Sequence, residues 1–404
     1  MEIEDNLEAI VGDEEEKNLL KEIAKPLLAW YDVNARILPW RENVTPYRVW
    51  ISEVMLQQTR VEAVKSYFER FMKALPTIQA LAEIEDDYLL KLWEGLGYYS
   101  RARNVKKTAN IVVEQYGGEF PSNYDDLMKL PGIGSYTAGA ISSIAFGNPV
   151  PAVDGNVLRV ISRVLASEED ITNQSVKKKV EDELRATMPQ FKPGAFNQAL
   201  MEIGAMVCVP NGMAKCEICP LKQLCKANIL GIVMDLPKKT PKKPRTIEEK
   251  TILVIKSGDK VALRKRGNKG ILAGLYEFPN MDGYLSENEV LYLVKQMSLS
   301  AIRIQQLEPS KHIFTHKEWH MIGYVIKVEE LEQSDVLERI TDLKNAVELA
   351  KLEERPYLEQ NNSLFKDCFF VEPGEMEEKY PIPTAFQRYT KYINIILGND
   401  KFKD

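Results

Sequence analysis

The sequence lacks any run of eighteen or more apolar residues, so it gives no sign of a membrane-spanning helix. Its first sixteen residues are acidic and do not have the basic and then apolar order of a signal peptide. Cysteine and histidine are scarce, at five and three residues among 404, and no internal repeat is visible. These absences predict a cytoplasmic globular protein without a membrane partner, and its length suffices for two domains.

Basic residues are slightly outnumbered, and a formal net charge of −6 argues at first against a polyanionic partner. The first sixteen residues, however, contain eight acids and no base. The rest of the chain therefore has 59 − 8 = 51 acids against 53 bases, or a net charge of +2. An acidic tail over residues 1–17 on a near-neutral body is compatible with a local basic groove, although it does not demonstrate one.

Apolar residues recur at three- and four-residue steps through the first half of the chain, for example at Val54, Val61 and Val64. This spacing is typical of amphipathic helices, and no strand-like alternation interrupts it. We therefore predict an all-helical domain over residues 18–232. The prolines and lysines that follow predict an extended linker over residues 233–248, either a simple spacer or a strap that touches phosphates.

Beyond the linker the period of the apolar residues changes to two, which predicts strands, and helical stretches lie between them. We therefore predict a second, α+β domain over residues 249–404. The charged residues 329–366 are interpreted as a surface insertion without an assigned function. The predicted strands cover residues 251–255, 260–264, 275–278, 321–328 and 368–371, and the predicted helices cover residues 289–297 and 385–397.

The segment 130–139 (LPGIGSYTAG) carries the sharpest signal for function. Gly132 and Gly134 let the chain turn tightly, and the helix that starts near Ser135 directs the positive end of its dipole outward. A duplex phosphate fits such a hairpin without sequence preference. A Gly-x-Gly pair alone suits any tight connection between helices, but the whole segment resembles the helix-hairpin-helix element of base-excision glycosylases.

Two carboxylates near this hairpin are candidates for catalysis. Glu53 lies in an otherwise apolar helical segment, where burial favours the protonated form that a general acid needs; a surface position is the alternative. Asp154 precedes a helical run, where a capping carboxylate is expected in any protein. In the helix-hairpin-helix superfamily, an Asp at this distance from the hairpin faces the flipped nucleotide. There its charge opposes the cation that develops on the sugar.

Four of the five cysteines lie within eighteen residues, with the spacing C-x7-C-x2-C-x5-C. A reducing compartment disfavours disulfides, so this spacing predicts a site for zinc or for an iron–sulfur cluster. Zinc sites usually have two C-x2-C pairs, and here there is one. The fifth cysteine, Cys368, is interpreted as a small core residue. The candidate ligands are Cys208, Cys216, Cys219 and Cys225.

Several segments resemble, in order and spacing, the adenine DNA glycosylases of the MutY family, and the resemblance covers about residues 27–224. It implies that Glu53 protonates the adenine and handles the attacking water, while Asp154 stabilises the oxocarbenium ion. Tyr136 and Asn156 would support these two carboxylates. The segments that carry the resemblance are 38–41, 52–58, 95–99, 130–139 and 154–157. The implied DNA contacts in this region are Arg41 in the adenine pocket, Gln58, Leu96 and Tyr98 beside the orphaned base, and Gly132 and Gly134 in the hairpin.

The same resemblance implies a [4Fe-4S] cluster on the four cysteines. The first gap between them has seven residues, 209–215, where the family commonly has six, and a loop one residue longer can still close on the same cluster. Tyr136 stands where the related endonuclease III enzymes have a nucleophilic lysine. Because a phenol cannot form a Schiff base, we expect base removal by water without efficient strand cleavage.

The second domain resembles the Nudix-like C-terminal domain of MutY proteins. The segment after Gly274 lacks the magnesium-binding glutamates of a true Nudix hydrolase, so we expect a domain that recognises a base. Phe314, Thr315 and His316 match the Phe-Ser-His loop with which the family contacts 8-oxoguanine, and Thr keeps the hydroxyl. An ordinary loop is the alternative, and a zinc site on the three histidines is not favoured in this strand-and-loop context.

The sequence thus predicts a monomeric, two-domain DNA glycosylase that removes adenine opposite 8-oxoguanine or guanine from double-stranded DNA in the cytoplasm, at the nucleoid. Three alternatives are a pyrimidine-directed glycosylase and lyase, a catalytically silent lesion-binding protein, and a nucleotide-pool hydrolase. The phenol at Tyr136 disfavours the first, and the retention of both Glu53 and Asp154 disfavours the second. The missing magnesium-binding helix disfavours the third.

Overall fold

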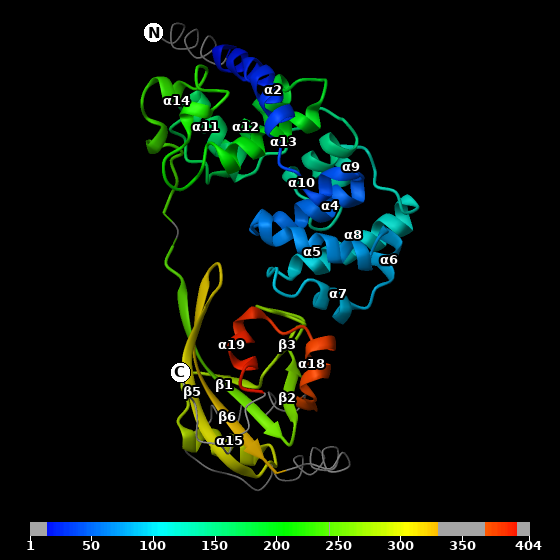
Figure 1. Ribbon diagram of the computed structural model, residues 1–404, viewed down its shortest axis with the longest axis vertical. Helices are drawn as coiled ribbons and strands as arrows, with labels where there is room; N and C mark the ends of the chain where they lie inside the picture. The colour runs from blue at the N-terminus through cyan, green and yellow to red at the C-terminus, as the bar shows by residue number, and fades with distance from the viewer. Residues whose placement is uncertain (1–13, 242, 330–367, 394–404) are drawn as a thin grey trace. The chain divides into compact units, whose positions relative to one another are not determined.

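The computed structural model describes residues 14–241, 243–329 and 368–393 (Figure 1). Its contacts divide the chain into two compact units. The first comprises Met1–Ile84 and Ser100–Lys242, and the second comprises Glu85–Tyr99 and Lys243–Asp404. No helix in the described ranges is long and apolar enough to cross a membrane.

The first unit is helical, and its described residues contain no β-strand, as the apolar spacing predicts. A π-helical turn, η1 (Ile141–Ala145), follows α10 directly, and short 3-10 turns are η2 (Cys216–Ile218) and η3 (Val233–Asp235). The α-helices are α2 (Ala24–Asn34), α3 (Pro39–Glu42), α4 (Pro46–Leu56), α5 (Val61–Ala74), α6 (Ile78–Glu83), α8 (Ser100–Tyr116), α9 (Tyr124–Met128), α10 (Ser135–Ala140), α11 (Gly155–Leu165), α12 (Gln174–Thr187), α13 (Pro193–Met206) and α14 (Lys226–Ile229).

Helix α11 forms the centre of one hydrophobic core in this unit. Its residues Val157 and Ile161 are fully buried and belong to the same cluster as Leu200 of α13 and Leu27 of α2. Figure 1 shows α2, α11, α12 and α13 together on one side of the unit, with α4–α6 and α8–α10 on the other. Burial of this kind supplies most of the stability of such helices, because propensity alone contributes little. The core therefore fixes the start of α11, where Asp154 lies.

The second unit contains a mixed sheet of seven strands in the described residues, together with α7 (Asp86–Leu92). The long strands β1 (Thr246–Ser257) and β6 (Lys317–Val328) pair in parallel, and β5 (Ala301–Ile313) pairs with β6 in antiparallel register. The order is β3-β2-β1-β6-β5, while β4 pairs with β1 and β7 with β2. The remaining strands are β2 (Lys260–Lys265), β3 (Tyr276–Glu277), β4 (Asn280–Asp282) and β7 (Cys368–Val371).

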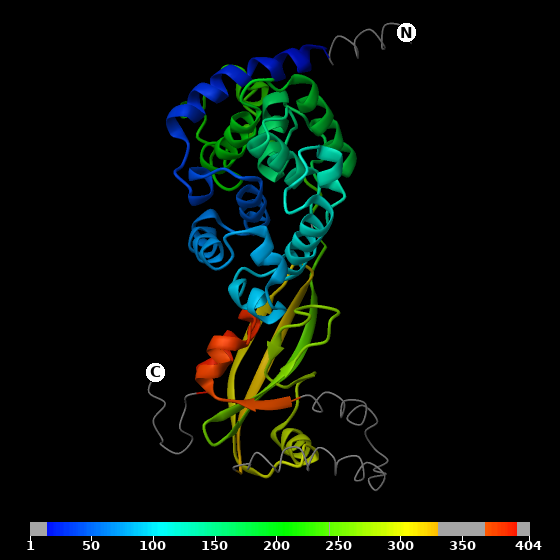
Figure 2. The ribbon, with the colours of Figure 1, turned by 90° about the vertical axis from the view of Figure 1, so that its right-hand side faces the viewer.

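Both faces of this sheet are buried. Along β1, Ile252 and Val254 face one core with residues of α18 (Pro373–Lys379), η5 (Thr384–Phe386) and α19 (Gln387–Thr390), whereas Leu253 and Ile255 face a second core with α15 (Glu287–Gln296) (Figures 1 and 2). A strand buried on both faces has a continuous apolar run, as β1 has here. The α+β architecture agrees with the prediction from the sequence.

Several details differ from that prediction or lie outside the described residues. Strand β1 begins at Thr246, inside the segment predicted as a linker, because its first residues already pair with Lys317 and Glu318 of β6. Strand β5 was not anticipated from the sequence at all. The predicted helix over residues 385–397 is only a 3-10 turn and the short α19 as far as it is described. The predicted insertion over residues 329–366 lies almost entirely outside the described residues.

Candidate active site

A cavity of about 690 Å³ opens in the first unit between the α3–α4 region, α10, the start of α11 and α13. Its size is within the range of small-molecule and cofactor sites. The structure brings seven of the residues singled out from the sequence to the wall of this one cavity. They are Arg41, Glu53, Gln58, Gly134, Tyr136, Asp154 and Asn156.

Glu53 lies in the apolar helix α4 and is only 6% exposed, so the burial predicted from its neighbours is confirmed. Burial raises the pKa of its carboxyl to about 7, and the negative charge of Asp154 acts in the same direction. The hydrogen bond from Tyr136 and the charge of Arg41 oppose this rise. Near neutral pH, Glu53 is therefore poised between a proton donor and a proton acceptor.

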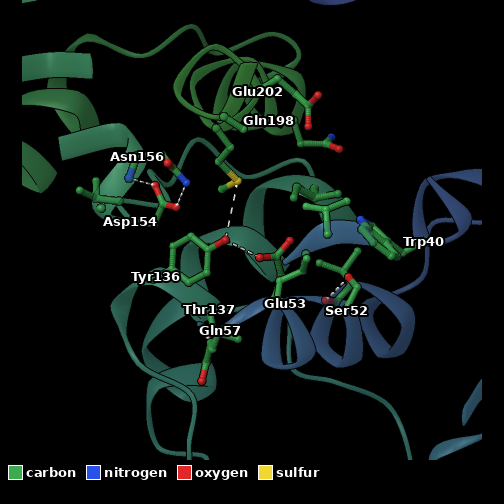
Figure 3. A pocket seen from close by; sticks show the side chains of 18 of the residues that line it. Trp40, Ser52, Glu53, Gln57, Tyr136, Thr137, Asp154, Asn156, Gln198 and Glu202 are labelled. Atoms are coloured by element: carbon green, nitrogen blue, oxygen red, sulfur yellow. Dashed lines mark hydrogen bonds between the residues drawn. The ribbon is translucent and has the colours of Figure 1, made fainter. Parts of the chain in front are cut away.

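Tyr136 lies on α10, and its hydroxyl donates a hydrogen bond to Oε2 of Glu53 (Figure 3). Burial and the nearby negative charges hold the pKa of Tyr136 well above its usual range, so the phenol keeps its proton. The hydroxyl also lies 3.7 Å from the sulfur of Met201 on α13. Because the phenol occupies Oε2, the proton of a neutral Glu53 is left on Oε1.

Asp154 is the N-cap of α11, as expected, and it also lines the cavity. Its Oδ1 accepts hydrogen bonds from the backbone N–H groups of Asn156 and Val157, at 2.9 and 2.8 Å. Its Oδ2 accepts one from the Asn156 amide at 2.7 Å (Figure 3). The capping role and a catalytic role are therefore not exclusive, since the cap fixes the position of the carboxylate at the cavity wall.

Asn156 is fixed in turn from two sides. Arg159, one turn later on α11 and 3% exposed, donates to Oδ1 of Asn156 at 2.9 Å and to the backbone oxygen of Cys208 at 2.8 Å. On the other side, α13 approaches so closely at Gly204 that a Cβ there would lie 2.6 Å from Cβ of Asn156. A larger residue at Gly204 would therefore displace the side chain that positions Asp154.

Gln58 follows α4 in a left-handed conformation with φ of 57°, which is strained for a residue other than glycine. The buried Arg101 stabilises this turn, because one of its guanidinium nitrogens donates to the backbone oxygens of Val54, Met55 and Gln57 at 2.7 to 2.9 Å. The structure thus gives a physical reason for a buried arginine at position 101. It holds the exposed Gln58 at the rim of the cavity.

The hairpin before α10 has two glycines with different requirements. Gly132 has a φ of 76°, and a Cβ there would lie 2.8 Å from Asn104, so glycine is needed for the turn itself. Gly134 has an extended backbone and open space where a Cβ would lie. The tight turn therefore depends on Gly132, and the contacts of this protein do not explain a glycine at position 134.

Several further residues line the cavity, and four of them have polar or sulfur-containing side chains on α13 or in the segment before α3. These four are Arg36, Gln198, Met201 and Glu202. Figure 3 labels Gln198 and Glu202. Gln198 and Glu202 are polar residues one turn apart in a largely apolar helix. This is the same signal that identified Glu53 in α4, so it could have identified them too.

The four clustered cysteines lie in the loop between α13 and α14 and are all partly buried and free. Their thiols are near enough to influence one another: burial above all, and then the other cysteines, raise the pKa of Cys216 and Cys225, and burial raises that of Cys219 to about 12. A guanidinium nitrogen of Arg163 donates to the sulfur of Cys208 at 3.1 Å. Within the described ranges, however, no three His, Cys, Asp or Glu side chains are placed as ligands of one metal ion.

The other residues singled out from the sequence lie in the second unit. Thr315 and His316 are exposed in the turn between β5 and β6, and the Thr315 hydroxyl lies 2.8 Å from the Tyr98 hydroxyl. Tyr98 is 45% exposed, whereas Leu96 is 6% exposed, so in this loop the Tyr98 side chain is accessible and that of Leu96 is buried. The three histidines lie on β5, in this turn and on β6, and no metal site is found on them in the described residues.

Comparison with known proteins identifies both parts of the chain. Residues 51–186 match the model of the HhH-GPD superfamily of base excision DNA repair proteins, and residues 251–392 match the model of the NUDIX domain. The adenine DNA glycosylase of Buchnera aphidicola subsp. Baizongia pistaciae is 37% identical over 294 residues, covering 72% of this chain and 82% of that protein. The chain belongs to the adenine DNA glycosylases.

Relatives of this glycosylase also occur outside bacteria. The adenine DNA glycosylase of Homo sapiens is 35% identical over 351 residues, covering 72% of this chain and 64% of the human protein. Among solved structures, a thermostable thymine-DNA glycosylase is 28% identical, with a TM-score of 0.47, and covers 53% of this chain and 98% of its own. The family membership confirms the predicted fold class, a helix-hairpin-helix glycosylase domain followed by a Nudix-like domain, and it confirms that the protein is a glycosylase of DNA repair.

Proposed function

We propose that this glycosylase flips adenine out of double-stranded DNA where it is paired with 8-oxoguanine or guanine, and hydrolyses the bond between adenine and deoxyribose. It would act as a monomer and without efficient strand cleavage. One observation carries the proposal: a buried glutamic acid, Glu53, with a pKa of about 7 lines the same cavity as the carboxylate Asp154.

The chemistry follows from these two groups. The Oε1 proton of Glu53 passes to the departing base as the bond between C1′ and the base nitrogen breaks and its electron pair leaves with the base. The sugar then carries positive charge, which the Asp154 carboxylate at the cavity wall opposes. Water adds to C1′, and its proton returns to Glu53, which is then a carboxylate. Both groups end the cycle as they began it.

The proposal that strand cleavage is inefficient depends on whether an amine near the cavity can act as a nucleophile. Tyr136 supplies a phenol where a lyase would need an amine. Lys177 of α12 also lines the cavity, but its ammonium lies 3.2 Å from the Ser135 hydroxyl and 3.5 Å from the Glu181 carboxylate. An amine held in an ion pair is a poor nucleophile, because attack on C1′ requires the neutral form. This supports hydrolysis over covalent chemistry.

Recognition of the opposite base would fall to the exposed turn Phe314–Thr315–His316 in the second unit. The turn is held by its neighbours, since the Phe314 ring packs edge-on against Trp319 at 4.8 Å between ring centres. A turn with an exposed hydroxyl and imidazole can discriminate hydrogen-bond donors on a purine. In α15, the acids of the first turn are Glu287 and Glu289, and Glu289 completes a capping box with Ser286. These acids are not adjacent, which favours recognition over metal-dependent hydrolysis.

The four cysteines would hold a [4Fe-4S] cluster. The donor set fits this group, because four thiols lie in one loop, influence one another's pKa, and include Cys208, which already accepts a hydrogen bond from a cation. When bound, the cluster would supply structural cross-linking of the loop that follows α13. The catalytic step proposed above does not pass through it.

The test is single-turnover release of adenine from a duplex with one A opposite 8-oxoguanine, comparing the wild type with Glu53→Gln. The wild type should produce an abasic site that breaks only after hot alkali, and the variant should lose about 10²–10⁴-fold in rate. Glu69→Gln, a change of an exposed glutamate on α5, is the matched control and should react like the wild type. Tight binding of the duplex without adenine release would show a lesion-binding protein and refute the proposal.

A further inference from the structure

Glu202 of α13 is a carboxylate of the cavity lining that is bound by two arginines, and the reaction proposed above gives it no role. Its side chain is 2% exposed. Its Oε2 accepts a hydrogen bond from Nε of Arg36 at 2.8 Å, and its Oε1 accepts from Nη2 of Arg36 at 2.7 Å and from Nη2 of Arg41 at 3.0 Å. One buried carboxylate thus binds two guanidinium groups, one of them in the bidentate geometry typical of strong pairs.

Of these two arginines, Arg41 is the one whose position affects the proposed proton transfer. It lines the cavity together with Glu53, and its charge lowers the pKa of Glu53. Its Nη1 donates to the backbone oxygen of Arg36 at 3.0 Å, and its guanidinium lies 5.6 Å from the centre of the Tyr31 ring. Its Nε is buried and has no hydrogen-bond partner among the described residues. Glu202 therefore supplies the carboxylate contact that Arg41 makes.

Among the described residues, the following charged and titratable groups act on the two glutamates and their partners. Burial opposes ionisation of Glu202, but the hydrogen bonds and charges of Arg36 and Arg41 outweigh it and lower the pKa of its carboxyl. Tyr31 of α2 is the other titratable group beside this pair, and Glu62 of α5 acts on Arg36. Glu53 is faced by Tyr136 of α10, by Asp154 at the start of α11, and by Arg41.

We propose that Glu202 is a positioning residue that keeps the Arg41 guanidinium on α13, so that Arg41 does not pair with the Glu53 carboxyl. This inference rests on the proposed role of Glu53 as the general acid. Without Glu202, the cation in the cavity would have Glu53 and Asp154 as the remaining carboxylates of the lining. An arginine paired with Glu53 would stabilise the charged form and remove the proton that the leaving base needs.

A purely structural role would also explain a buried ion pair between α13 and the segment before α3. The two roles differ in one measurable quantity, the pH at which Glu53 loses its proton. A structural tie changes stability and overall rate at all pH values. A positioning residue changes the midpoint of the Glu53 titration, and the sign is fixed, because a released cation can only favour the carboxylate.

The experiment follows the Glu53 carboxyl by ¹³C NMR in full-length protein labelled on glutamate, with Glu53→Gln identifying the resonance. Exposed glutamates titrate near about 4.3, so a resonance that titrates near 7 stands apart. In Glu202→Gln, which keeps the side-chain volume, the midpoint should fall by about one pH unit. The rate of adenine release at pH 8 should fall roughly tenfold with it, and less at pH 6, since a shift of one unit changes the protonated fraction tenfold above both midpoints.

Three further variants separate charge from structure. Glu202→Asp keeps the carboxylate and should keep the wild-type midpoint, even if its rate falls. The double variant Glu202→Gln/Arg41→Gln also removes the cation whose charge acts on Glu53, while Arg36 keeps its charge. It therefore tests Arg41 in particular, and its midpoint should return to the wild-type value or above. Glu183→Gln removes another buried glutamate, on α12 and outside this cavity, and should leave the midpoint unchanged.

Two results would overturn the inference: an unchanged Glu53 midpoint in folded Glu202→Gln, or a lowered midpoint that persists in the double variant. If Glu202→Gln does not fold, the double variant decides, since a midpoint below that of the wild type contradicts the proposal. The NMR titration needs no turnover. A wild type that shows the expected midpoints but releases no adenine would refute the proposed function and leave the role of Glu202 in positioning Arg41 intact.

Discussion

Glu53 in the helical unit and Glu277 in the second unit are two buried glutamates with opposite partners. Glu53, 6% exposed, receives a hydrogen bond from the neutral hydroxyl of Tyr136, and burial raises its pKa to about 7. Glu277, 1% exposed, lies between Arg264, at 2.7 Å, and Arg266. Both glutamate side chains are buried, and they differ in the charge of the residues that bind them. Burial beside a neutral donor yields an acid, and burial between two cations yields an ion pair that connects β2 and β3.

Glu202 extends this comparison into the active site, since it is bound by two arginines as Glu277 is, yet it lines the same cavity as Glu53. The cavity therefore contains both kinds of buried glutamate. Arg41 binds one of them, Glu202, and its charge lowers the pKa of the other, Glu53. The lesson is that a carboxylate in a cavity is a candidate acid only when the cations nearby already have another partner.

The largest effect is expected where a paired glutamate loses its charge. Glu277→Gln leaves two guanidinium groups facing a neutral amide, and breaking a buried pair in this way costs about 3–5 kcal/mol of stability. The unfolding transition of the second unit, followed by calorimetry, should move to a lower temperature. Adenine release at low temperature, where the protein is folded, should stay near the wild-type rate, because Glu277 does not line the cavity.

Glu287→Gln serves as the control for this change, because Glu287 is exposed on α15 and should alter stability by less than about 0.5 kcal/mol. An equal loss in both variants would show that Glu277 and its arginines contribute nothing specific. A stable Glu277→Gln protein with slow adenine release would place Glu277 in the catalytic machinery and dissolve the contrast with Glu53.

Glu53→Gln, in contrast to Glu277→Gln, should increase the stability of the protein above neutral pH. The folded pKa is about 7 against an ordinary value of 4.5, so between these pH values the unfolded chain binds fewer protons than the folded one. The stability of the wild type should therefore fall as pH rises from about 4.5 to about 7, by roughly 3 kcal/mol, and level off above. Glu53→Gln lacks this loss and should be the more stable protein at pH 8.

Urea unfolding of the wild type and Glu53→Gln at pH 5 and pH 8 measures this difference, and Glu69→Gln is again the exposed control. The stability gap between the two proteins should widen from pH 5 to pH 8. A gap that stays constant would mean that Glu53 is not titrating abnormally, and the assignment of the general acid would lose its physical basis.

Much of the site was predictable because each part has a local signal. The apolar neighbours of Glu53 predicted its burial, and the position of Asp154 before a helical run predicted a cap, which the structure confirms. Partners distant in sequence have no such signal: Arg36 and Glu202 are separated by 166 residues, and only the fold brings them together. Glu202 itself had a local signal, as a polar residue in an apolar helix, and it was overlooked.

The fold, too, was predictable where the sequence has a local signal and was not predictable where that signal is weak. The strands and helices with regular apolar periods were predicted, whereas β5 was missed. This strand lies at the edge of the sheet, and most of its side chains are exposed or half-buried, so the alternation of apolar and polar residues is weak. It also contains an irregularity in its pairing between Leu307 and Ser310, around Pro309, a residue that edge strands tolerate. The apolar period of a sequence follows the burial of its side chains, and few side chains of an edge strand are buried.

The smallest effect is expected from the neutral partner of Glu53. The hydrogen bond from Tyr136 lowers the pKa of Glu53, so Tyr136→Phe should raise it above about 7, by up to about one unit. The falling limb of the pH–rate profile for adenine release should then lie at higher pH than in the wild type. Tyr47→Phe is the matched control, because Tyr47 is another buried tyrosine. It lies on α4, and its hydroxyl donates to the Leu75 backbone oxygen at 2.9 Å.

The control should lose some stability and keep its pH midpoint, which separates loss of a buried hydroxyl from loss of this particular hydrogen bond. A midpoint that moves down in Tyr136→Phe would mean that the phenol stabilises the neutral form of Glu53, and the donor and acceptor in this hydrogen bond would have to be exchanged. In that case the proton would lie on Oε2, between the two oxygens, and it could not reach the base without Tyr136 moving. The direction of this small shift therefore decides which oxygen of Glu53 faces the substrate.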